Sequence, residues 1–567
     1  MLAIVRPARV LELALLALLV WFGFQAVQLA RLKYFTIDEF QYSHAAWLVA
    51  NGQMPYRDFF EVHFPLVYQV LSPVFLIAGD DPTAVVGLRF GMLPFVAMAA
   101  GAVAFLNVRQ GKLAALAAPV LLLALPSFVT LATEVRPDAI AAALFLGSLA
   151  VLRIERLGDR MAAAISGLLL VASMWGTQKA TFYGSIFGLA FVADLIALRR
   201  GSSRSLLRNP VAFLSGGVAG VAVIAMYLTV TGSWAAWWHW CFAWAVEHQR
   251  NYPGFPWRKY FDPILIDSLW LFLLAGWGLV RSVQALSTRG REAWRDPDAL
   301  LIGALISTFA SIVLQRAPYP YSFLAFLGVV AVYAARGIGD LLAARTRPLV
   351  AALLGVALVA VLTMQGVTLA GYVATTNAGQ LQVLDRIGTL TGPTDAAYDN
   401  SGGYVARPHA YFYFYTDSFL RESIAETLDR EVPQGILDRG AVLHLRDIRF
   451  DSLPASLKKF LDRHFQPVDG DISLWGEHYV VPPAGRLQDT FLASRDDRYF
   501  ISPASALSSG ILTIDGEPVR DAIFQLKRGE HRISYQGGGE IDILWLPRDG
   551  KTWQPQRGLP PTFSRVF

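Results

Sequence analysis

The chain has little cysteine and little charge. Cys241 is its only cysteine, so no disulfide can form within the chain and no cysteine-based metal site can exist. Charged residues make up only 16% of its 567 residues, whereas 54% are hydrophobic. This balance is too apolar for a soluble protein, and the length is too great for one domain. The composition therefore indicates a membrane protein with more than one domain.

The apolar residues occur in blocks of roughly 18 to 24, the length that crosses about 30 Å of hydrocarbon as a helix. We therefore expect a polytopic α-helical membrane protein with about eleven transmembrane helices. They are predicted at 10–30, 84–107, 113–132, 138–152, 161–177, 180–198, 210–230, 263–281, 298–315, 318–335 and 349–371. The segment 63–78 is short and contains Pro65 and Pro73, so we expect it to form juxtamembrane helices within a first outer loop, 31–83.

The distribution of arginine predicts the orientation. The net charge of +5 and the pI near 9.1 could suggest nucleic acid, but most arginines lie in short loops between apolar blocks. With 63–78 on the surface, the basic loops all fall on one side, at 109–112, 153–160, 199–208, 281–295 and 336–347. Short basic loops stay in the cytoplasm. The sequence thus predicts a multi-pass protein of the inner (cytoplasmic) membrane, with its C-terminal part extracytoplasmic and no nucleic-acid partner.

The sequence divides into three regions. A transmembrane domain spans 1–372, and after Tyr372 the composition becomes polar. Helical and strand patterns predict an extracytoplasmic α/β domain at 373–487. Hairpin turns at Asp515-Gly516 and Arg528-Gly529 predict a β-rich appendage at 488–567. A tryptophan-rich outer loop, 231–262, is typical of an aromatic belt at the membrane surface, although one or two of its rings could stack on a sugar.

Two adjacent carboxylates, Asp38 and Glu39, follow the first apolar block. Thr36-x-x-Glu39 has the pattern of a capping box, which would explain Glu39 as a helix cap and Asp38 as a favourable first-turn charge. That explanation leaves their location unexplained. A short interfacial helix carrying Phe40 and Trp47 would hold both acids just above the hydrocarbon. A base that meets a substrate arriving in the lipid would be placed there, so Asp38 is a candidate for chemistry, and Glu39 could serve either purpose.

Further ionisable residues lie at helix ends on the same side. Pro137 can start a helix, and capping would explain Glu134 and Asp138 beside it, but not Arg136. Lys179 lies between two apolar helices, where its ammonium group needs an anion or the interface.

Two more groups on this side have alternative explanations. His63 next to Glu61 could be a metal pair, although two residues do not make a site. Arg316 could be an anchor or a phosphate ligand. Charges of this kind are costly in a membrane unless they are paired or functional. They gather at one face and not at the midplane between matching halves, which favours an enzyme over a transporter.

These residues resemble a known family. The first outer loop contains Asp38-Glu39, Tyr42, Ala46, Asn51-Gly52, Pro55-Tyr56 and His63-x-Pro65-Leu66-x-Tyr68. This set of residues is similar to the first outer loop of the C-type (GT-C) glycosyltransferase superfamily, in particular the family 39 branch with the protein O-mannosyltransferases and the aminoarabinose transferase of lipid A. Glu134-x-Arg136-Pro137-Asp138 resembles the second outer turn of the family. Thr177-x-Lys179 resembles a later Thr-Lys-Gly turn, with an intervening glutamine and Ala180 in place of glycine. The resemblance covers roughly 1–340.

The resemblance implies an inverting transferase that moves one sugar from a polyprenyl-phosphate donor to an acceptor at the outer face of the membrane. The acceptor could be a glycolipid, a polysaccharide or a protein. Asp38 would be the general base, with Glu39 orienting or binding. Lys179, Arg136 and Arg316 would bind the donor phosphate, and Tyr42, His63, Glu134 and Asp138 would bind substrate. Some members use a divalent metal ion, but this sequence shows no convincing ligand set for one.

Two other functions remain open on sequence alone. One is a transporter or flippase for a lipid-linked sugar, and the other is a non-catalytic membrane scaffold that binds glycans. An enzyme requires Asp38, Lys179 and Arg136 to converge, whereas separations beyond about 15 Å, far outside hydrogen-bond reach, would favour the scaffold. The sequence does not identify the sugar, the acceptor, the metal dependence, the oligomeric state or the role of the C-terminal part.

Overall fold

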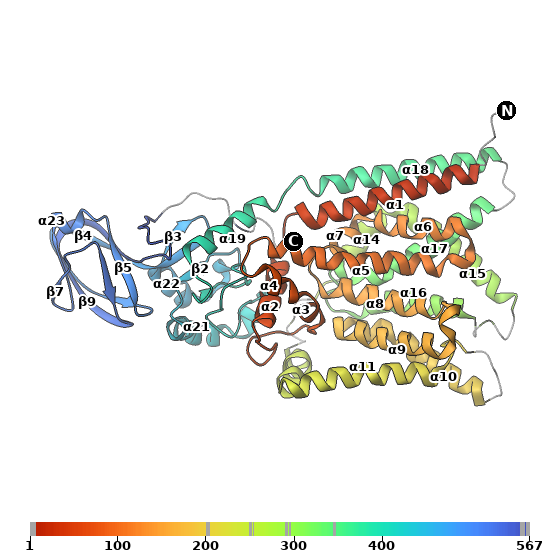
Figure 1. Ribbon diagram of the computed structural model, residues 1–567, viewed down its shortest axis with the longest axis horizontal. Helices are drawn as coiled ribbons and strands as arrows, with labels where there is room; N and C mark the ends of the chain where they lie inside the picture. The colour runs from red at the N-terminus through yellow and green to blue at the C-terminus, as the bar shows by residue number, and fades with distance from the viewer. Residues whose placement is uncertain are drawn as a thin grey trace.

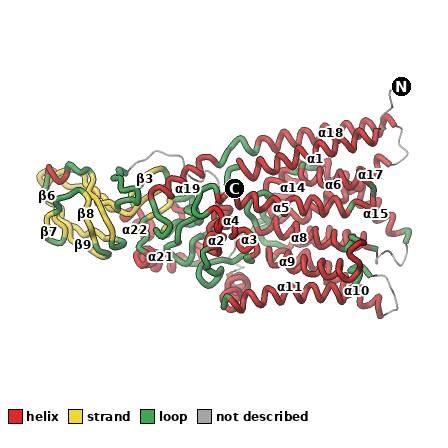
Figure 2. Tube along the Cα trace, in the orientation of Figure 1, coloured by secondary structure: helices red, strands yellow, loops and turns green. Residues whose placement is uncertain are grey.

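The structure is a computed structural model that describes residues 7–199, 205–248, 252, 254–289, 293, 296–343, 348–555 and 562. Parts of the expected loops 199–208, 231–262, 281–295 and 336–347 lie outside these residues. A bundle of long helices forms one part of the molecule, and a domain containing the strands forms the other (Figures 1 and 2). The short helices of the first outer loop lie at the junction of the two parts (Figure 1).

All eleven segments expected to span the membrane are helical. They are α1 (Pro7–Leu32), α5 (Ala84–Leu106), α6 (Lys112–Leu123) with α7 (Pro126–Ala132), α8 (Pro137–Val151), α9 (Gly158–Gly176), α10 (Lys179–Arg199), α11 (Pro210–Val230), α15 (Leu269–Ser287), α16 (Pro297–Leu314), α17 (Leu324–Ala343) and α18 (Pro348–Gly371). Within the described residues, nine helices are long and apolar enough to cross a membrane, or ten with the bent pair α6 and α7. The eleventh, α8, has 15 residues. A polytopic helical membrane protein is thereby confirmed.

Two expected helices are broken. The segment 113–132 bends by 71° between α6 and α7, because Pro126 cannot continue the hydrogen bonding of α6. The segment 263–281 is divided at Ser268 into α14 (Arg258–Asp267) and α15. Before it, the tryptophan-rich loop forms α12 (Trp234–Trp238), a π-helical turn (His239–Ala243) and α13 (Trp244–His248).

The helix α17 lies at the centre of the bundle. Of the apolar window in Pro320–Leu342, 89% is buried, far more than in any other described span. Its neighbour α15 approaches it closely through Gly278, where an added Cβ would lie 2.0 Å from the carbonyl oxygen of Tyr333. Small residues let membrane helices pack backbone to backbone in this way. The centre of the bundle is therefore closely packed, and the end of α17 that follows the turn at Pro320 is anchored in this packing.

The first outer loop contains α2 (Ile37–Ala50), α3 (Leu66–Leu71) and α4 (Pro73–Ala78). The last two have six residues each, so neither can cross a bilayer, as the sequence predicted for 63–78. On α2, the buried residues include Phe40, Trp47 and Leu48, which pack into the main hydrophobic core. The helix that carries Asp38 is thus enclosed between the bundle and the C-terminal domain.

The C-terminal domain begins with α19 (Ala378–Leu390), β1 (Ala397–Tyr398), α20 (Ser418–Ser423), α21 (Ala425–Arg439), β2 (Leu443–Leu445), α22 (Ala455–His464) and β3 (Phe465–Asp469). It continues with β4 (Ile472–Ala493), β5 (Asp497–Ser502), α23 (Ala506–Ser509), β6 (Ile511–Ile514), β7 (Glu517–Pro518), β8 (Ile523–Leu526) and β9 (Gly529–Trp545). The strand order is β1-β2-β4-β9-β5-β8, with β3 on β4 and with β6 on β9 and β7. The predicted α/β and β-rich patterns are both present.

The long strand β4 joins the two halves of this domain. Its first residues pair with β2 and β3, and the remainder pairs antiparallel with β9 from Gly476↔Leu544 to Ala493↔Gly529. The boundary expected between 487 and 488 falls inside this strand. One continuous hydrophobic core also runs through both halves, from Val383 on α19 to Trp553.

Hydrogen bonds to the backbone attach the C-terminal domain to the first outer loop. Gln380 accepts a hydrogen bond from the Phe35 amide at 2.8 Å and donates one to the Phe35 carbonyl at 3.0 Å. The Phe60 amide donates to the carbonyl of Phe412 at 2.9 Å. A ring nitrogen of His44, on α2, lies 2.6 Å from the carbonyl oxygen of Val405. The domain therefore contacts the loop that contains the candidate site, on the side away from the bundle.

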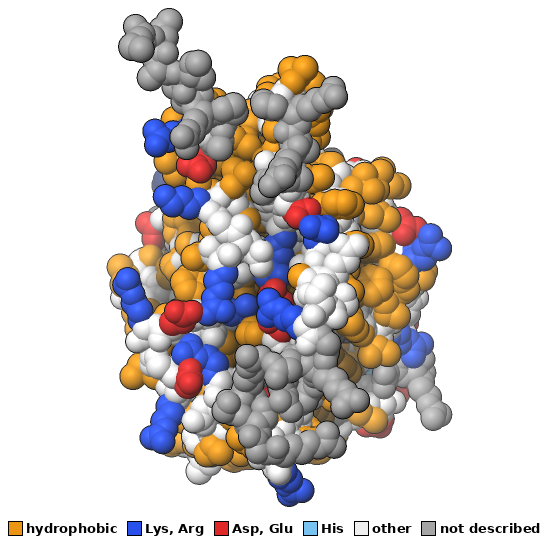
Figure 3. Space-filling model, turned by 90° about the vertical axis from the view of Figure 1, so that its right-hand side faces the viewer, with side chains coloured by type: hydrophobic (Ala, Val, Ile, Leu, Met, Phe, Trp, Pro, Cys, Tyr) orange, Lys and Arg blue, Asp and Glu red, His pale blue; other side chains and the backbone are white. Residues whose placement is uncertain are grey.

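The opposite end of the bundle carries basic side chains. Lys and Arg side chains are spread over this face, with fewer acidic ones among them (Figure 3). Arg153 and Arg336 share the carboxylate of Asp298, at 2.9 and 3.0 Å. The basic loops and the C-terminal domain thus lie at opposite ends of the helices (Figures 1 and 3).

Candidate active site

A cavity of about 530 Å³ lies between the bundle and the C-terminal domain. Residues of the first outer loop, the tryptophan-rich region, the turn before α17 and the C-terminal domain all contribute to its wall. The lining residues are Asp38, Gln41, Tyr42, Phe60, Val62, His63, Trp244, Ala245, Tyr252, Arg316, Tyr319, Tyr321, Tyr415, Asp417, Phe419, Leu420, Arg421, Ile448 and Arg449. Four of the residues predicted from sequence, Asp38, Tyr42, His63 and Arg316, are among them.

Asp38 is held between two guanidinium groups. It lies in the first turn of α2, whose N-cap is Thr36. Its Oδ2 accepts a hydrogen bond from Nη1 of Arg136 at 3.0 Å, and its Oδ1 lies 3.9 Å from Nη2 of Arg449. The side chain is 17% exposed and lines the cavity. One carboxylate oxygen thus faces the bundle and the other faces the C-terminal domain.

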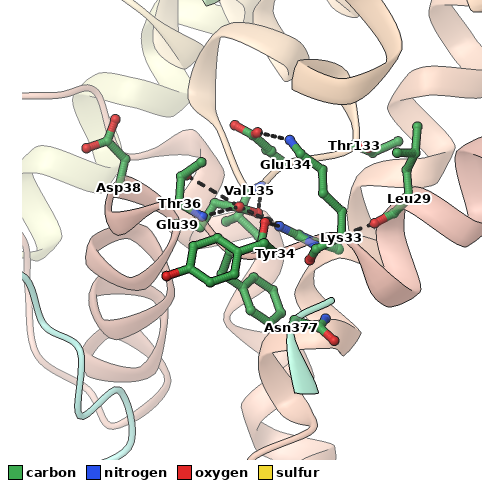
Figure 4. Close-up of polar contacts among 12 residues, drawn as sticks. Leu29, Lys33, Tyr34, Thr36, Asp38, Glu39, Thr133, Glu134, Val135 and Asn377 are labelled. Carbon is green, nitrogen blue, oxygen red and sulfur yellow. Dashed lines mark hydrogen bonds and ion pairs between the residues drawn. The ribbon is translucent and has the colours of Figure 1, made fainter. Parts of the chain in front are cut away.

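Glu39 has different surroundings from Asp38. It is fully buried, and its two carboxylate oxygens accept hydrogen bonds from Nε and Nη2 of Arg89 at 2.7 and 2.6 Å. The backbone amides of Thr36 and Val135 donate to it at 3.0 and 3.1 Å. Figure 4 shows this network, with Asp38 pointing away from it. The predicted cap is present, but Glu39 does not line the cavity, and its contacts are those of a structural ion pair.

Arg136 is engaged by all three of its nitrogens. Nε binds Glu134, Nη1 binds Asp38, and Nη2 lies 3.3 Å from the hydroxyl of Thr36. Glu134 also binds Lys33 (Figure 4). These partners leave Arg136 little capacity for a phosphate, and they fix the position of Asp38. Glu134 is likewise buried in this network and does not line the cavity.

Lys179 lies just behind the cavity wall. Its Nζ donates to Oδ1 of Asp138 at 2.9 Å and lies 4.3 Å from the centre of the Tyr321 ring. The guanidinium carbon of Arg136 lies 4.6 Å from the centre of the same ring. Tyr321 itself lines the cavity. Asp38, Arg136 and Lys179 therefore converge around one tyrosine, as the enzyme interpretation required and the scaffold interpretation did not.

His63 and Tyr42 line the cavity, and His63 belongs to a hydrogen-bond network that includes two tyrosines. Glu61 accepts hydrogen bonds from Nδ1 of His63 at 2.7 Å and from the hydroxyls of Tyr68 and Tyr415. Burial opposes the charge on His63, but Glu61 overcomes it and raises the pKa of the imidazole above its usual value. Burial, followed by the charge of Asp38, raises the pKa of Tyr42 well above its usual value, so its phenol remains a hydrogen-bond donor.

The tryptophan-rich loop contributes residues both to the exposed surface and to the cavity wall. Trp234 and Trp238 are exposed, as in an aromatic belt. Trp244 lines the cavity instead, and its ring contacts Phe60 and Phe419 at centroid distances of 6.4 and 5.6 Å. Tyr252 of the same loop also lines the cavity.

Sequence reasoning missed the contribution of the C-terminal domain. On the side of the C-terminal domain, the cavity is lined by Tyr415, Asp417, Arg421 and Arg449. Tyr415 ends a run of five aromatic residues, 411–415, which is a visible signal, whereas Asp417, Arg421 and Arg449 are single charged residues in a polar region. Tyr321 could have been identified, because it lies only five residues after Arg316, in the short segment Arg316-Ala-Pro-Tyr-Pro-Tyr321.

The residues around Asp38 do not fit a divalent metal ion. Two guanidinium groups flank its carboxylate, whereas a metal would need several carboxylate or imidazole ligands there. Among the described residues, no group of three or more His, Cys, Asp and Glu side chains is arranged to hold a metal. Glu61 and His63 bind each other, and Glu61 also accepts a hydrogen bond from Tyr68. The two residues that the sequence offered as a metal pair are therefore not joined by further metal ligands among the described residues.

The chain was compared with known proteins. No protein-family model matches it, and no curated protein matches it. The crystal structure of ArnT from Cupriavidus metallidurans bound to undecaprenyl phosphate matches with a TM-score of 0.53 at 12% identity, over 82% of this chain and 97% of that chain. The archaeal oligosaccharyltransferase AglB from Archaeoglobus fulgidus, in complex with an inhibitory peptide and a dolichol-phosphate, gives a TM-score of 0.49 at 12% identity, over 80% and 72% of the two chains. The chain therefore shares its fold with the ArnT structure.

Proposed function

We propose that this protein is an inverting glycosyltransferase that moves a single sugar from a polyprenyl-phosphate donor to an acceptor hydroxyl at the outer face of the cytoplasmic membrane. One observation carries the proposal: a carboxylate, Asp38, lies in the wall of the cavity with cationic side chains beside it. The fold shared with ArnT, which was solved with undecaprenyl phosphate bound, is consistent with a lipid-linked donor.

Asp38 has the surroundings of a general base. The acceptor oxygen would attack the anomeric carbon while the bond from that carbon to the phosphate oxygen breaks, with its electron pair going to the phosphate. The acceptor proton would pass to Asp38. A lipid phosphate is a competent leaving group, so one positioned carboxylate is sufficient for acid–base chemistry. Arg136 holds this carboxylate in place from the bundle side.

Fixed cations would stabilise the departing phosphate. Arg316 lines the cavity, and Lys179 lies behind Tyr321 with Asp138 as one partner for its three donors. Such groups act strongly where water is scarce and where they need no reorganisation during the reaction. Arg136 contributes to the same positive field but is occupied by carboxylates, so we assign it to positioning Asp38.

An apolar groove could hold the prenyl chain of the donor. It has a volume of about 650 Å³, lies between α15, α16 and α17, and is lined by Phe272, Leu305, Phe309, Val313 and Phe326 among others. Val313 lies in the last turn of α16, which ends at Leu314, and Arg316 follows two residues after that end. A lipid in this groove would therefore direct its phosphate toward the cavity.

The charge distribution supports the orientation. Short basic loops stay in the cytoplasm, and the basic end of the bundle lies opposite the C-terminal domain (Figure 3). We therefore assign the cavity and the C-terminal domain to the outer side of the cytoplasmic membrane. There the acceptor could be a glycolipid, a polysaccharide or a protein.

Mass spectrometry of cell-envelope glycans and lipids tests this function. We compare cells that have the wild-type protein, cells that lack it, and cells that carry Asp38→Asn. The wild-type cells should contain a glycan with one added sugar mass that is missing from the other two, and the unconsumed lipid-linked sugar should accumulate in Asp38→Asn. The Asn side chain keeps the shape but cannot accept the proton, so turnover should fall by about 10²- to 10⁴-fold.

The matched control is Asp262→Asn. This carboxylate is exposed, pairs with Arg258 and does not line the cavity, so its removal should leave the glycan unchanged. A normal glycan in Asp38→Asn cells would refute the assignment of the base. Purified Asp38→Asn should still bind undecaprenyl phosphate, whereas a transporter would show altered affinity or flux.

A further inference from the structure

Two arginines of the C-terminal domain, Arg421 and Arg449, contribute positive charge to the wall of the cavity. Both line it, and both are largely enclosed, with Arg421 8% exposed and the Arg449 side chain 11% exposed. Arg421 follows the first turn of α20, and Arg449 lies in the loop between β2 and α22. Segments separated by 28 residues thus bring two like charges to one side of the cavity.

Backbone carbonyls fix both guanidinium groups. Nη1 of Arg421 donates to the carbonyl of Thr416, and Nη1 of Arg449 donates to that of Asn400 at 2.8 Å. Neutral carbonyls hold the groups in place without neutralising their charge. The remaining N–H groups are therefore positioned in advance for another partner.

The charge of this pair is incompletely balanced. Among the described residues, no carboxylate oxygen lies within 4.0 Å of the Arg421 guanidinium, and its buried Nε has no hydrogen-bond partner. The ion-pair contact of Arg449 is the long one to Asp38, at 3.9 Å. Burial, followed by the charge of Arg449, lowers the pKa of Arg421, while the carboxylates of Asp447, Asp417 and Glu422 act in the opposite direction without contacting it directly. A buried guanidinium with no carboxylate in direct contact is costly, so this arrangement is suited to an anion that arrives from outside the chain.

The position of the pair indicates which substrate carries that anion. Lys179 and Arg316 lie at the ends of membrane-crossing helices, on the side of the apolar groove. Arg421 and Arg449 belong to the C-terminal domain, and Oδ1 of Asp38 lies 3.9 Å from Nη2 of Arg449. A donor phosphate would enter from the side of the groove, and an acceptor would enter from the side of the C-terminal domain.

We infer that Arg421 and Arg449 form an acceptor subsite that binds an anionic group, a carboxylate or a phosphate, on the acceptor glycan and so brings its hydroxyl to Oδ1 of Asp38. This inference rests on the transferase function proposed above and specifies its acceptor as an acidic saccharide. Guanidinium groups match both anions through paired N–H donors.

Binding of small probes to the full chain in detergent micelles tests the subsite. We measure N-acetylglucosamine 1-phosphate, glucuronic acid and uncharged N-acetylglucosamine by saturation-transfer NMR, and undecaprenyl phosphate by native mass spectrometry. Wild-type protein should bind the two anionic sugars in preference to the neutral one. Loss of a charge-assisted contact in Arg421→Gln should weaken the anionic sugars by about tenfold to a hundredfold while undecaprenyl phosphate binds as before.

Three further variants make the result specific. Arg421→Lys keeps the charge and should retain part of the affinity for the anionic sugars. Arg449→Gln should also weaken the binding of these sugars, and it tests the subsite if Arg421→Gln fails to fold. Arg430→Gln removes an exposed arginine of the same domain and should change nothing. Equal binding of charged and neutral sugars would overturn the inference. Loss of undecaprenyl phosphate binding in Arg421→Gln would also overturn it, because the pair would then serve the donor. If the wild-type protein fails to bind undecaprenyl phosphate, the proposed function fails, and the anionic sugars still test the subsite.

Discussion

Replacing Glu39 by alanine should destabilise the protein far more than removing a carboxylate from an exposed ion pair would. The change leaves the guanidinium of Arg89, which is 1% exposed, without the carboxylate that binds it at 2.7 and 2.6 Å. Removing one partner of a buried ion pair costs about 3–5 kcal/mol. Arg89 keeps bonds to the carbonyls of Lys33 and Tyr34, which would reduce the loss to the lower end, about 3 kcal/mol.

An exposed ion pair provides the comparison. Glu155 pairs with Arg109 on the outside of the bundle, where both side chains are more than half exposed. Its replacement by alanine should cost about 0–1 kcal/mol, because solvent screens the pair. The double variant Glu39→Gln/Arg89→Met removes both buried charges and should recover much of the lost stability.

The assay is thermal unfolding of the purified variants in detergent micelles, followed by tryptophan fluorescence. We expect Glu39→Ala to melt well below both wild type and Glu155→Ala, with the double variant between them. If Glu39→Ala melts no lower than Glu155→Ala, Glu39 is not a structural ion pair, and its assignment outside the chemistry is wrong.

Three further predictions concern the junction between the domains. Gly402→Ala should destabilise the protein by about 1–2 kcal/mol from backbone conformation alone, since φ is +69° and an added Cβ would lie 2.9 Å from Cβ of His44; a lower melting temperature checks this. Burial and the Asp447 carboxylate raise the pKa of Asp399 to about 7, above its unfolded value near 3.9. The stability of the protein should therefore fall as the pH rises from about 4 to 7. Melting temperatures measured between pH 5 and 8 should decrease less in Asp447→Asn than in the wild type. Arg136→Lys should lower turnover by about a hundredfold, because one ammonium cannot hold Asp38 in the same place, while binding of undecaprenyl phosphate persists in a native mass spectrum.

Each of these predictions has a control. Gly379→Ala lies in α19 with nothing within 4 Å of an added Cβ, so it should not destabilise. Equal melting of the two glycine variants would contradict the packing of Gly402 on α2. A stability profile of Asp447→Asn with the same slope as wild type would exclude the Asp399 pair as its source. Full activity in Arg136→Lys would show that Asp38 is positioned by other groups.

The sequence alone determined the membrane part of this protein. Each spanning segment is a local property, since about 20 apolar residues must form a helix to satisfy their backbone in lipid. The basic loops, the interfacial segment 63–78 and the α/β and β-rich patterns are also local. The cluster of Asp38, Lys179 and Arg136 could be anticipated because each lies at the same end of its helix, although their distances could not.

The tertiary structure alone distinguished Asp38 from Glu39. Successive residues on a helix point about 100° apart, so two adjacent acids meet different neighbours, and only the packing of α2 shows which one faces Arg89 and which faces the cavity. The arginines above the cavity are likewise invisible in the sequence. Arg449 meets Asp38 from more than 400 positions further along the chain, and no local pattern records a contact that only folding makes.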